Sequence, residues 1–125
     1  MVTVETGRRV LLVDDELTIR DALSDLLELE GFEVERAADG AEALEKLRLQ
    51  CPDLIVLDLM MPRMNGWDLL DLRRNELLCA DAPVIVMSAH RQMKASVQPF
   101  NVAAALEKPF DVDDLLRAID RVLSA

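Results

Sequence analysis

Residues 54–62 read LIVLDLMMP, and this stretch determines how the rest of the chain is interpreted. The four apolar residues 54–57 are typical of a short strand buried on both faces, as strands of parallel sheets are. Pro62 cannot donate to a strand ladder, so the strand is expected to end before it. Asp58 therefore lies at the carboxyl end of a central strand, where open α/β sheets bind their ligands.

Strand-like and helix-like segments alternate along the whole chain. Strands are predicted at residues 10–13, 33–37, 54–57, 84–87 and 103–106, and helices at 17–30, 43–47, 66–78, 91–98 and 112–123. Such alternation is typical of stacked βαβ units, and the charged strand at 33–37 belongs at an edge. The predicted fold class is α/β: a single flavodoxin-like (βα)5 domain with a doubly wound parallel sheet and strand order 2-1-3-4-5. It covers residues 9–125, and residues 1–8 are expected to form a flexible N-terminal segment.

The 125 residues carry a formal net charge of −10. This acidic balance argues against direct nucleic acid binding by the domain and against binding to anionic membranes, because both require basic surface. No apolar run approaches the roughly 20 residues that span a bilayer. Residues 1–9 lack the apolar region of a secretory signal. We expect a cytoplasmic protein that contacts no membrane.

The chain has two cysteines, Cys51 and Cys79. Their spacing is not that of metal ligands, and no histidine lies near them in the sequence. We expect free structural thiols in a reducing cytosol. The sequence alone leaves a disulfide open as the alternative.

Polar residues close the other predicted strands. Asp14 and Asp15 follow the first strand, whereas Ser88 follows the fourth and Lys108 the fifth. Because the carboxyl ends of parallel strands meet at one edge, and neighbouring strands lie about 4.8 Å apart, three carboxylates crowd one site around Asp58. Such a cluster either takes up protons or binds a cation, and a hard divalent ion such as Mg²⁺ suits oxygen ligands.

Lys108 and Ser88 complement a phosphoryl group at this edge. The ammonium group acts as a point charge and the hydroxyl can donate a hydrogen bond. With a carboxylate nucleophile and a metal, they supply what phosphoryl transfer to Asp58 requires. The chain has no GxxxxGK[ST] or GxGxxG loop, and no Ser or Cys elbow accompanies the lone His90. P-loop, dinucleotide and catalytic-triad chemistry are therefore not indicated.

Four motifs together resemble the receiver domain of bacterial two-component response regulators. They are LLVDDE at residues 11–16, DLMMPRMNG at 58–66, VMSA at 86–89 and EKPF at 107–110. The resemblance covers essentially the whole chain from Arg9 onward. It implies a phosphoacceptor of a histidine–aspartate phosphorelay, in which only Asp58 itself is phosphorylated and dephosphorylated, rather than an enzyme that turns over an outside substrate.

The resemblance also implies roles for the acidic cluster. Asp58 would accept the phosphoryl group from a phosphohistidine. Asp15, Asp58 and the backbone carbonyl of Met60 would bind Mg²⁺, or Mn²⁺, directly. Asp14 would act on the metal through water.

Further roles at the site follow from the same resemblance. Ser88 would bind a phosphoryl oxygen and move on activation, and Lys108 would pair with the phosphoryl group. The Lys108–Pro109 bond resembles the cis peptide of the family. Small Ala89 would keep access to the phosphoryl group open, and Met60 and His90 occupy the flanking positions that tune its lifetime.

The partners implied are those of a signalling module. A sensor histidine kinase or a histidine phosphotransfer protein would donate the phosphoryl group. A downstream effector protein, or a C-terminal effector domain, would receive the signal. A homodimer through the fourth helix, fifth strand and fifth helix is common in the family.

The chain departs from the family pattern in the region that carries the signal. Three residues before the lysine, where a Tyr or Phe is usual, it has Ala105, and it contains no Tyr. Pro99 falls in the last turn of the predicted fourth helix, where proline removes a hydrogen bond and clashes one turn back. Asn101 tolerates the left-handed turn that should follow. We expect a short, irregular or mobile fourth helix, and a phosphoryl-dependent shift of that helix in place of an aromatic switch.

Two alternatives stay open at this point. A Mg²⁺-dependent phosphohydrolase of the haloacid-dehalogenase type needs a second Asp two residues after the nucleophile, where this chain has Met60, and usually a cap domain, for which it has no length. A degenerate receiver would act as a phosphorylation-independent binding module. The intact acidic, Ser and Lys set opposes this interpretation, whereas Ala105 and Pro99 favour it.

Overall fold

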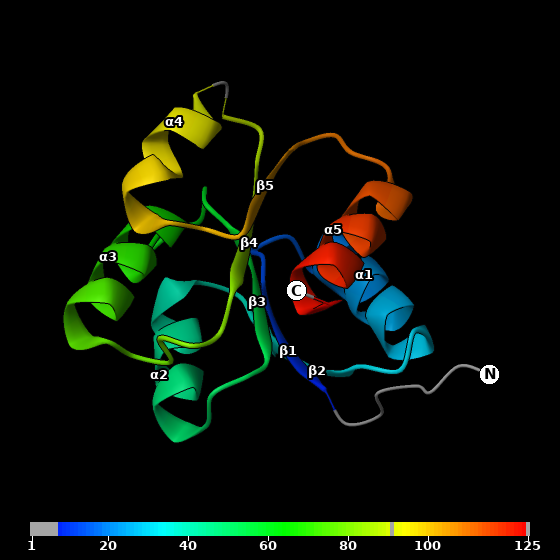
Figure 1. Cartoon of the computed structure of the whole chain (residues 1–125), viewed down its shortest axis with the longest axis horizontal. Coiled ribbons are helices and arrows are strands. Elements are labelled where there is room, and N and C mark those ends of the chain that lie inside the picture. Colours follow the sequence, from blue (N-terminus) through cyan, green and yellow to red (C-terminus); the bar gives the residue numbers. More distant parts are fainter. Residues whose placement is uncertain (1–7, 91, 125) are drawn as a thin grey trace.

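The computed structural model describes residues 8–90 and 92–124. Within them, five parallel strands form one sheet in the order β2-β1-β3-β4-β5, and helices cover both faces (Figure 1). The predicted flavodoxin-like (βα)5 architecture and its strand order are confirmed. The predicted N-terminal segment, apart from Arg8, lies outside the described residues.

The strands are β1 (Arg9–Val13), β2 (Glu33–Ala37), β3 (Leu54–Asp58), β4 (Val84–Ser88) and β5 (Ala104–Glu107). The helices are α1 (Leu17–Leu29), α2 (Gly40–Leu49), α3 (Gly66–Glu76), α4 (Met93–Val97) and α5 (Val112–Ser124), and a 3₁₀ turn, η1 (Gln98–Phe100), follows α4. None of the described helices is long and apolar enough to cross a membrane.

Alternate residues of the central strands contribute to two separate cores. Leu11 and Leu57 pack with residues of α2, α3 and α4, whereas Val10 and Val56 pack with residues of α1 and α5. Figure 1 shows the same division, with α2, α3 and α4 on one side of the sheet and α1 and α5 on the other. Because both faces are covered, β3 and β4 are buried along their whole length. This is why their sequences are continuous apolar runs.

The strand register brings the polar strand ends to one edge. Val13 of β1 pairs with Leu57 of β3, and Asp58 pairs with Met87 of β4. The residues after Val13 and the last residue of β3 therefore emerge beside each other. The β4 pairing places Ser88 one residue beyond Asp58 along the same edge.

The α4 region is shorter than its sequence pattern predicts. A helix was expected over residues 91–98, but α4 covers only Met93–Val97 before it tightens into the 3₁₀ turn that contains Pro99. Asn101 then adopts a left-handed conformation with φ 55°. The expectation of a short, irregular helix is confirmed, because proline cannot supply the hydrogen bond that another α-helical turn needs.

The expectation of free cysteine thiols is wrong for this structure. Cys51 and Cys79 form a disulfide, with their Cα atoms 5.4 Å apart. Cys51 lies in the loop that enters β3, and Cys79 lies in the loop that enters β4. Because β3 and β4 are neighbours, the two loops meet, and the separation of 28 positions between the cysteines gives no hint of this.

Candidate functional site

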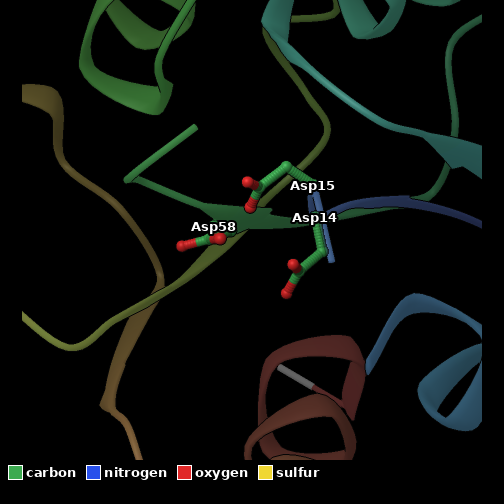
Figure 2. A group of neighbouring side chains, drawn as sticks. All are labelled: Asp14, Asp15 and Asp58. Atoms are coloured by element: carbon green, nitrogen blue, oxygen red, sulfur yellow. The ribbon is translucent and has the colours of Figure 1, made fainter. Parts of the chain in front are cut away.

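Three carboxylates converge where β1 and β3 end side by side. Asp14 and Asp15 follow β1, and Asp58 is the last residue of β3. The three can offer carboxylate oxygens that all lie within 4.8 Å of one another (Figure 2). Asp14 and Asp58 are 0% and 4% exposed, whereas Asp15 is open to solvent. The predicted acidic cluster is therefore present, with one exposed and two buried members.

Lys108 reaches this cluster from the end of β5. Its Nζ lies 3.2 Å from Asp14 Oδ2 and 3.5 Å from Asp58 Oδ2. Its backbone N–H donates to the carbonyl of Ser88, 2.8 Å away, and fixes the start of the loop. The peptide bond to Pro109 is cis, as the resemblance implied. One ammonium group thus bridges two buried carboxylates.

The surroundings of Asp58 and Lys108 shift the pKa values of both side chains. Burial raises the pKa of Asp58 to about 6, and the negative charge of Asp14 adds to this effect, whereas the charge of Lys108 opposes it. Burial alone would lower the pKa of Lys108, but the attraction of Asp58 and Asp14 outweighs it and the pKa is raised. Lys108 is therefore charged at neutral pH, and the Asp58 carboxyl ionises close to neutrality.

Backbone N–H groups orient two of the carboxylates. The N–H of Met60 donates to Asp58 Oδ1 at 3.2 Å, and the N–H of Glu16 donates to Asp14 Oδ1 at 3.0 Å. The Arg20 guanidinium also binds the backbone carbonyl of Asp14, at 2.7 Å. These bonds hold the loops after β1 and β3 in the positions that bring the carboxylates together.

The donor set fits a divalent cation. Three carboxylates face a single ammonium group, so the cluster keeps an excess of negative charge. Carboxylate oxygens are the hard ligands that Mg²⁺ and Mn²⁺ take. Burial, and secondarily the charge of Asp14, raises the pKa of Asp58, and a cation bound beside it would favour its ionised form.

The other predicted site residues lie at the same edge or at a distance from it. Ser88 is fully buried at the end of β4, and its hydroxyl accepts the N–H of His90 at 3.0 Å. Ala89 and His90 are exposed, as is the side chain of Met60. Ala89 and His90 thus follow Ser88 at the carboxyl end of β4, and Met60 follows Asp58 at the end of β3.

Ala105 and Pro99 lie away from the carboxylates, around α4 and β5. Ala105 borders a hollow of about 240 Å³, whose lining residues are Lys94, Val97, Gln98, Asn101, Val102, Ala104 and Ala105. No aromatic side chain is among them. Residue 105 therefore contributes only a methyl group to the wall of this hollow between α4 and β5.

The sequence pattern did not single out a second hollow beside Asp15. It measures about 370 Å³ and is lined by Asp15, Met60, Met61, Pro62, Asn65 and Trp67. Trp67 is half-buried, and its indole N–H donates to Ser96 Oγ of α4 at 2.9 Å. Its ring also meets His90 edge-on, with centroids 5.7 Å apart. Asn65, two residues before Trp67, caps the start of α3 with its side chain.

An ion pair that the sequence pattern also missed fastens the loop between β3 and α3. Arg63, with a left-handed φ of 63°, binds the buried carboxylate of Asp39. The N–H of Glu42 and the Arg63 guanidinium keep the pKa of Asp39 below its usual value. Beside it, the N–H of Gly40 donates to the carbonyl of Met64 at 2.8 Å. A Cβ on Gly40 would lie 2.3 Å from that oxygen, so only glycine permits this approach.

Comparisons with known proteins agree with this geometry. A family model described as the response regulator receiver domain matches residues 10–120. RpaA of Synechocystis, a DNA-binding dual master transcriptional regulator, is 37% identical in an alignment over 118 residues, and the match covers 92% of this chain and 48% of the relative. The chain thus spans about half the length of that relative.

Solved structures give the same result. TrrA of Thermotoga maritima, in complex with Mg²⁺-BeF, is 31% identical, has a TM-score of 0.83, and the match covers 93% of this chain and 99% of TrrA. CheY4 of Vibrio cholerae, a chemotaxis response regulator, is 34% identical with a TM-score of 0.86, over 94% and 100% of the two chains. Sequence, fold and site agree, and the chain belongs to the response regulator receiver domain family, the phosphoacceptor modules of two-component systems.

Proposed function

We propose that Asp58 is the residue that accepts the phosphoryl group, from the phosphohistidine of a sensor histidine kinase or a histidine phosphotransfer protein. The observation that carries this proposal is the contact of one ammonium group, that of Lys108, with both Asp14 and Asp58 inside a cluster of three carboxylates. The binding of Mg²⁺-BeF by TrrA supports it, because TrrA shares this fold over nearly the whole chain.

The transfer forms one bond and breaks another. A carboxylate oxygen of Asp58 attacks phosphorus, and the P–N bond to the donor imidazole breaks with its electron pair on nitrogen. Because the pKa of Asp58 is about 6, the carboxyl is mostly ionised at pH 7.5 and can act as the nucleophile. The N–H of Met60 holds one of its oxygens during the attack.

Lys108 and Ser88 receive the negative charge that arrives. The Lys108 ammonium lies 3.5 Å from Asp58 Oδ2. After the transfer it can donate a hydrogen bond to a phosphoryl oxygen on Asp58 with only a small movement of its side chain. The Ser88 hydroxyl, which now accepts the N–H of His90, has its own proton to donate to a second phosphoryl oxygen.

Asp15, Asp58 and the backbone carbonyl of Met60 would hold Mg²⁺, or Mn²⁺, directly, and Asp14 would act through water. When bound, the ion neutralises charge on the transferred phosphoryl group. The exposure of Asp15 leaves this side of the cluster open to solvent and to the donor protein.

Neither alternative fits the site as well. A phosphohydrolase needs a proton-donating acid two residues after Asp58, and the thioether of Met60 cannot donate a proton. A degenerate binding module has no use for three converging carboxylates and a lysine that contacts two of them. We therefore infer a phosphoacceptor that does not turn over an outside substrate.

The wider role follows the same proposal. The chain would act in the cytoplasm and pass its state to a downstream effector protein or to an effector domain of a longer protein. It would not bind nucleic acid or membrane itself, given a net charge of −10. A homodimer would use the face formed by α4, β5 and α5.

The signal would leave the site through α4, because Ala105 supplies no aromatic switch. Ser88 accepts the N–H of His90, His90 packs against Trp67, and Trp67 binds Ser96 of α4. A phosphoryl group that draws the Ser88 hydroxyl away would release this series of contacts. Amide exchange with and without beryllofluoride should therefore change within residues 92–100, and unchanged protection there would contradict the mechanism.

Mass spectrometry tests the phosphoacceptor assignment. The chain is incubated with acetyl phosphate and Mg²⁺, and a phosphoryl-sized mass gain is expected that Asp58→Asn abolishes. The control is Asp120→Asn on the exposed face of α5, which should keep the gain. No gain with either acetyl phosphate or a cognate kinase favours the binding module. Rapid multiple turnover of small phosphate esters favours the hydrolase.

A further inference from the structure

The Cys51–Cys79 disulfide lies at the opposite end of the strands from Asp58. Cys51 precedes β3 and Asp58 ends it, so the length of the strand separates the two sites. The disulfide joins the loop after α2 to the loop after α3. It takes no part in the phosphoacceptor site, so any chemistry at the disulfide is independent of the proposed function.

The two cysteines differ in how accessible they are to solvent. Cys51 is exposed, whereas Cys79 is half-buried and packs against the core beneath α2 and α3. A hollow of about 230 Å³ opens beside the bond, lined by Cys51, Pro52, Asp53, Cys79, Ala80, Asp81 and Ala82. An incoming thiol can therefore approach the disulfide from solvent and reach Cys51 first.

Contacts around Cys79 hold its backbone and offer its sulfur an acceptor. The half-buried guanidinium of Arg73 donates to the backbone carbonyl of Cys79 at 2.9 Å and also to that of Ala82. Once protonated, the Cys79 thiol has an acceptor in place, because its Sγ lies 3.5 Å from the carbonyl oxygen of Leu47.

Bonds other than the disulfide hold the same loops. Arg73 ties residues 79 and 82 together through their carbonyls, and the N–H of Ala82 donates to the carbonyl of Cys79 at 3.0 Å. Arg48 of α2 binds both carboxylate oxygens of Glu76 in α3, at 3.0 and 3.1 Å. The loops therefore keep their positions when the sulfur–sulfur bond opens, and the bond can form again.

We propose that Cys51–Cys79 is a reversible thiol–disulfide exchange site whose reductant is a dithiol. One thiolate of the dithiol attacks Cys51 Sγ, and the bond to Cys79 breaks with its electron pair on Cys79 Sγ, which takes a proton. The second thiol of the reductant then displaces Cys51 and becomes part of the reductant's own disulfide. Two electrons and two protons pass to the chain, which ends with two free thiols.

Equilibration of the full chain with glutathione buffers tests reversibility. Thiols are trapped by alkylation and counted by intact mass. Because the couple transfers two electrons, a change of roughly 100-fold in the ratio of squared reduced to oxidised glutathione should shift the oxidised fraction from about 90% to about 10%, in both directions. A chain that stays oxidised in the most reducing buffer, or reduced in the most oxidising one, would overturn the proposal.

A trapping experiment tests the direction of attack. A thioredoxin-type dithiol that lacks its second cysteine should form a mixed disulfide with Cys51, identified by peptide mapping. A mixed disulfide with Cys79, or none, would contradict the assignment. Asp58→Asn should exchange as the unmodified chain does, whereas Cys51→Ser should form no mixed disulfide.

Discussion

Among the three helices on one face of the sheet, the side formed by α2 and α3 and the side formed by α4 are built very differently. On one side, α2 and α3 have 10 and 11 residues, and a disulfide, an Arg48–Glu76 pair and the Arg63–Asp39 pair fasten them and their loops. On the other side, α4 has five residues, of which only Met93 and Val97 are buried, and it leads to the edge strand β5. Asp58 ends β3, and the neighbouring strand β4 leads toward α4.

The difference shows where a phosphoryl group can change the structure. Local opening costs least where few apolar side chains are buried and few contacts cross between elements. The α4 segment is held by Trp67 through Ser96 and by Arg74, which donates to the Pro99 carbonyl and lies 4.7 Å from the Phe100 ring centre. Movement should therefore occur at α4 while α2 and α3 remain in place.

Gly66→Ala should lower the free energy of unfolding most. It changes the first residue of α3, on the side that the disulfide and the two ion pairs stabilise. A Cβ at this position would lie 2.7 Å from the Cα of Leu59 and 2.9 Å from the carbonyl oxygen of Asp58. Backbone atoms cannot yield easily, so the free energy of unfolding should fall by about 4 kcal/mol, or folding should fail. Urea denaturation measures the loss.

Ala95→Gly is the matched substitution on the other side, at an exposed position of α4. It should cost about 1 kcal/mol or less, because it changes only helix propensity. If both substitutions lowered the free energy of unfolding by similar amounts, the proposed difference between the two sides would be wrong.

Reduction of the disulfide should have the next largest effect. The bond closes a loop between residues 28 apart, and its loss should lower the free energy of unfolding by about 3 kcal/mol through greater freedom of the unfolded chain. Thermal unfolding with and without a phosphine reductant measures this. The variant with both Cys51→Ser and Cys79→Ser should match the reduced chain and not respond to the reductant. Equal stability of the oxidised and reduced chains would show that the disulfide does not contribute to the greater stability of the α2 and α3 side.

Asp58→Asn should stabilise the metal-free protein at neutral pH. Folding raises the pKa of Asp58 from 3.8 to about 6, so the folded state binds its proton more tightly than the unfolded state does. The contribution of this group to stability therefore falls as the pH rises from about 4 to about 6 and stays low above that range. The variant should gain about 2 kcal/mol at pH 7.5 and almost nothing near pH 3.5.

Urea denaturation of both proteins at the two pH values, without divalent ions, measures this gain. A gain of the same size at pH 3.5 would show that charge is not its cause. Saturating Mg²⁺ should remove the gain at pH 7.5, because a cation stabilises the ionised carboxylate of the unmodified chain.

Ser96→Ala should have a small effect, close to that of Ala95→Gly, and should sharpen the contrast. It leaves the indole N–H of Trp67 without its acceptor, and it removes the bond from Ser96 Oγ to the Met93 carbonyl. A loss of about 1 kcal/mol is expected. Amide exchange should speed up in Met93–Val97 and stay unchanged in α2. Faster exchange in both places would show that α4 is not an independent unit.

Much of the fold and the acidic site could be predicted because the signals are local. Apolar runs marked β1, β3 and β4, and the polar alternation of residues 33–37 marked an edge strand, which is β2. Since parallel strands present their carboxyl ends at one edge, the positions of Asp14, Asp15 and Asp58 followed from the strand order. The effect of Pro99 on α4 was equally local, since proline acts on its own helix turn.

The contacts between loops that are distant in the sequence could not be predicted in the same way. Cys51 and Cys79 were expected to be free, and they meet only because β3 and β4 are neighbours. Arg63 and Asp39 are 24 residues apart and meet because a left-handed residue turns the loop toward the start of α2. The third helix was expected to reach residue 78, but it ends at Glu76 because Leu77 adopts a left-handed φ of 53°.

By itself, the sequence determined the α/β class, the strand order, the converging carboxylates and the family. Only the tertiary structure decided that Lys108 bridges Asp14 and Asp58, that the two cysteines join, and that Trp67 links the site to α4. The physical reason is distance along the chain. Hydrophobic periodicity reports which face of one element is buried, whereas pairing between distant side chains depends on how loops of different elements are brought together.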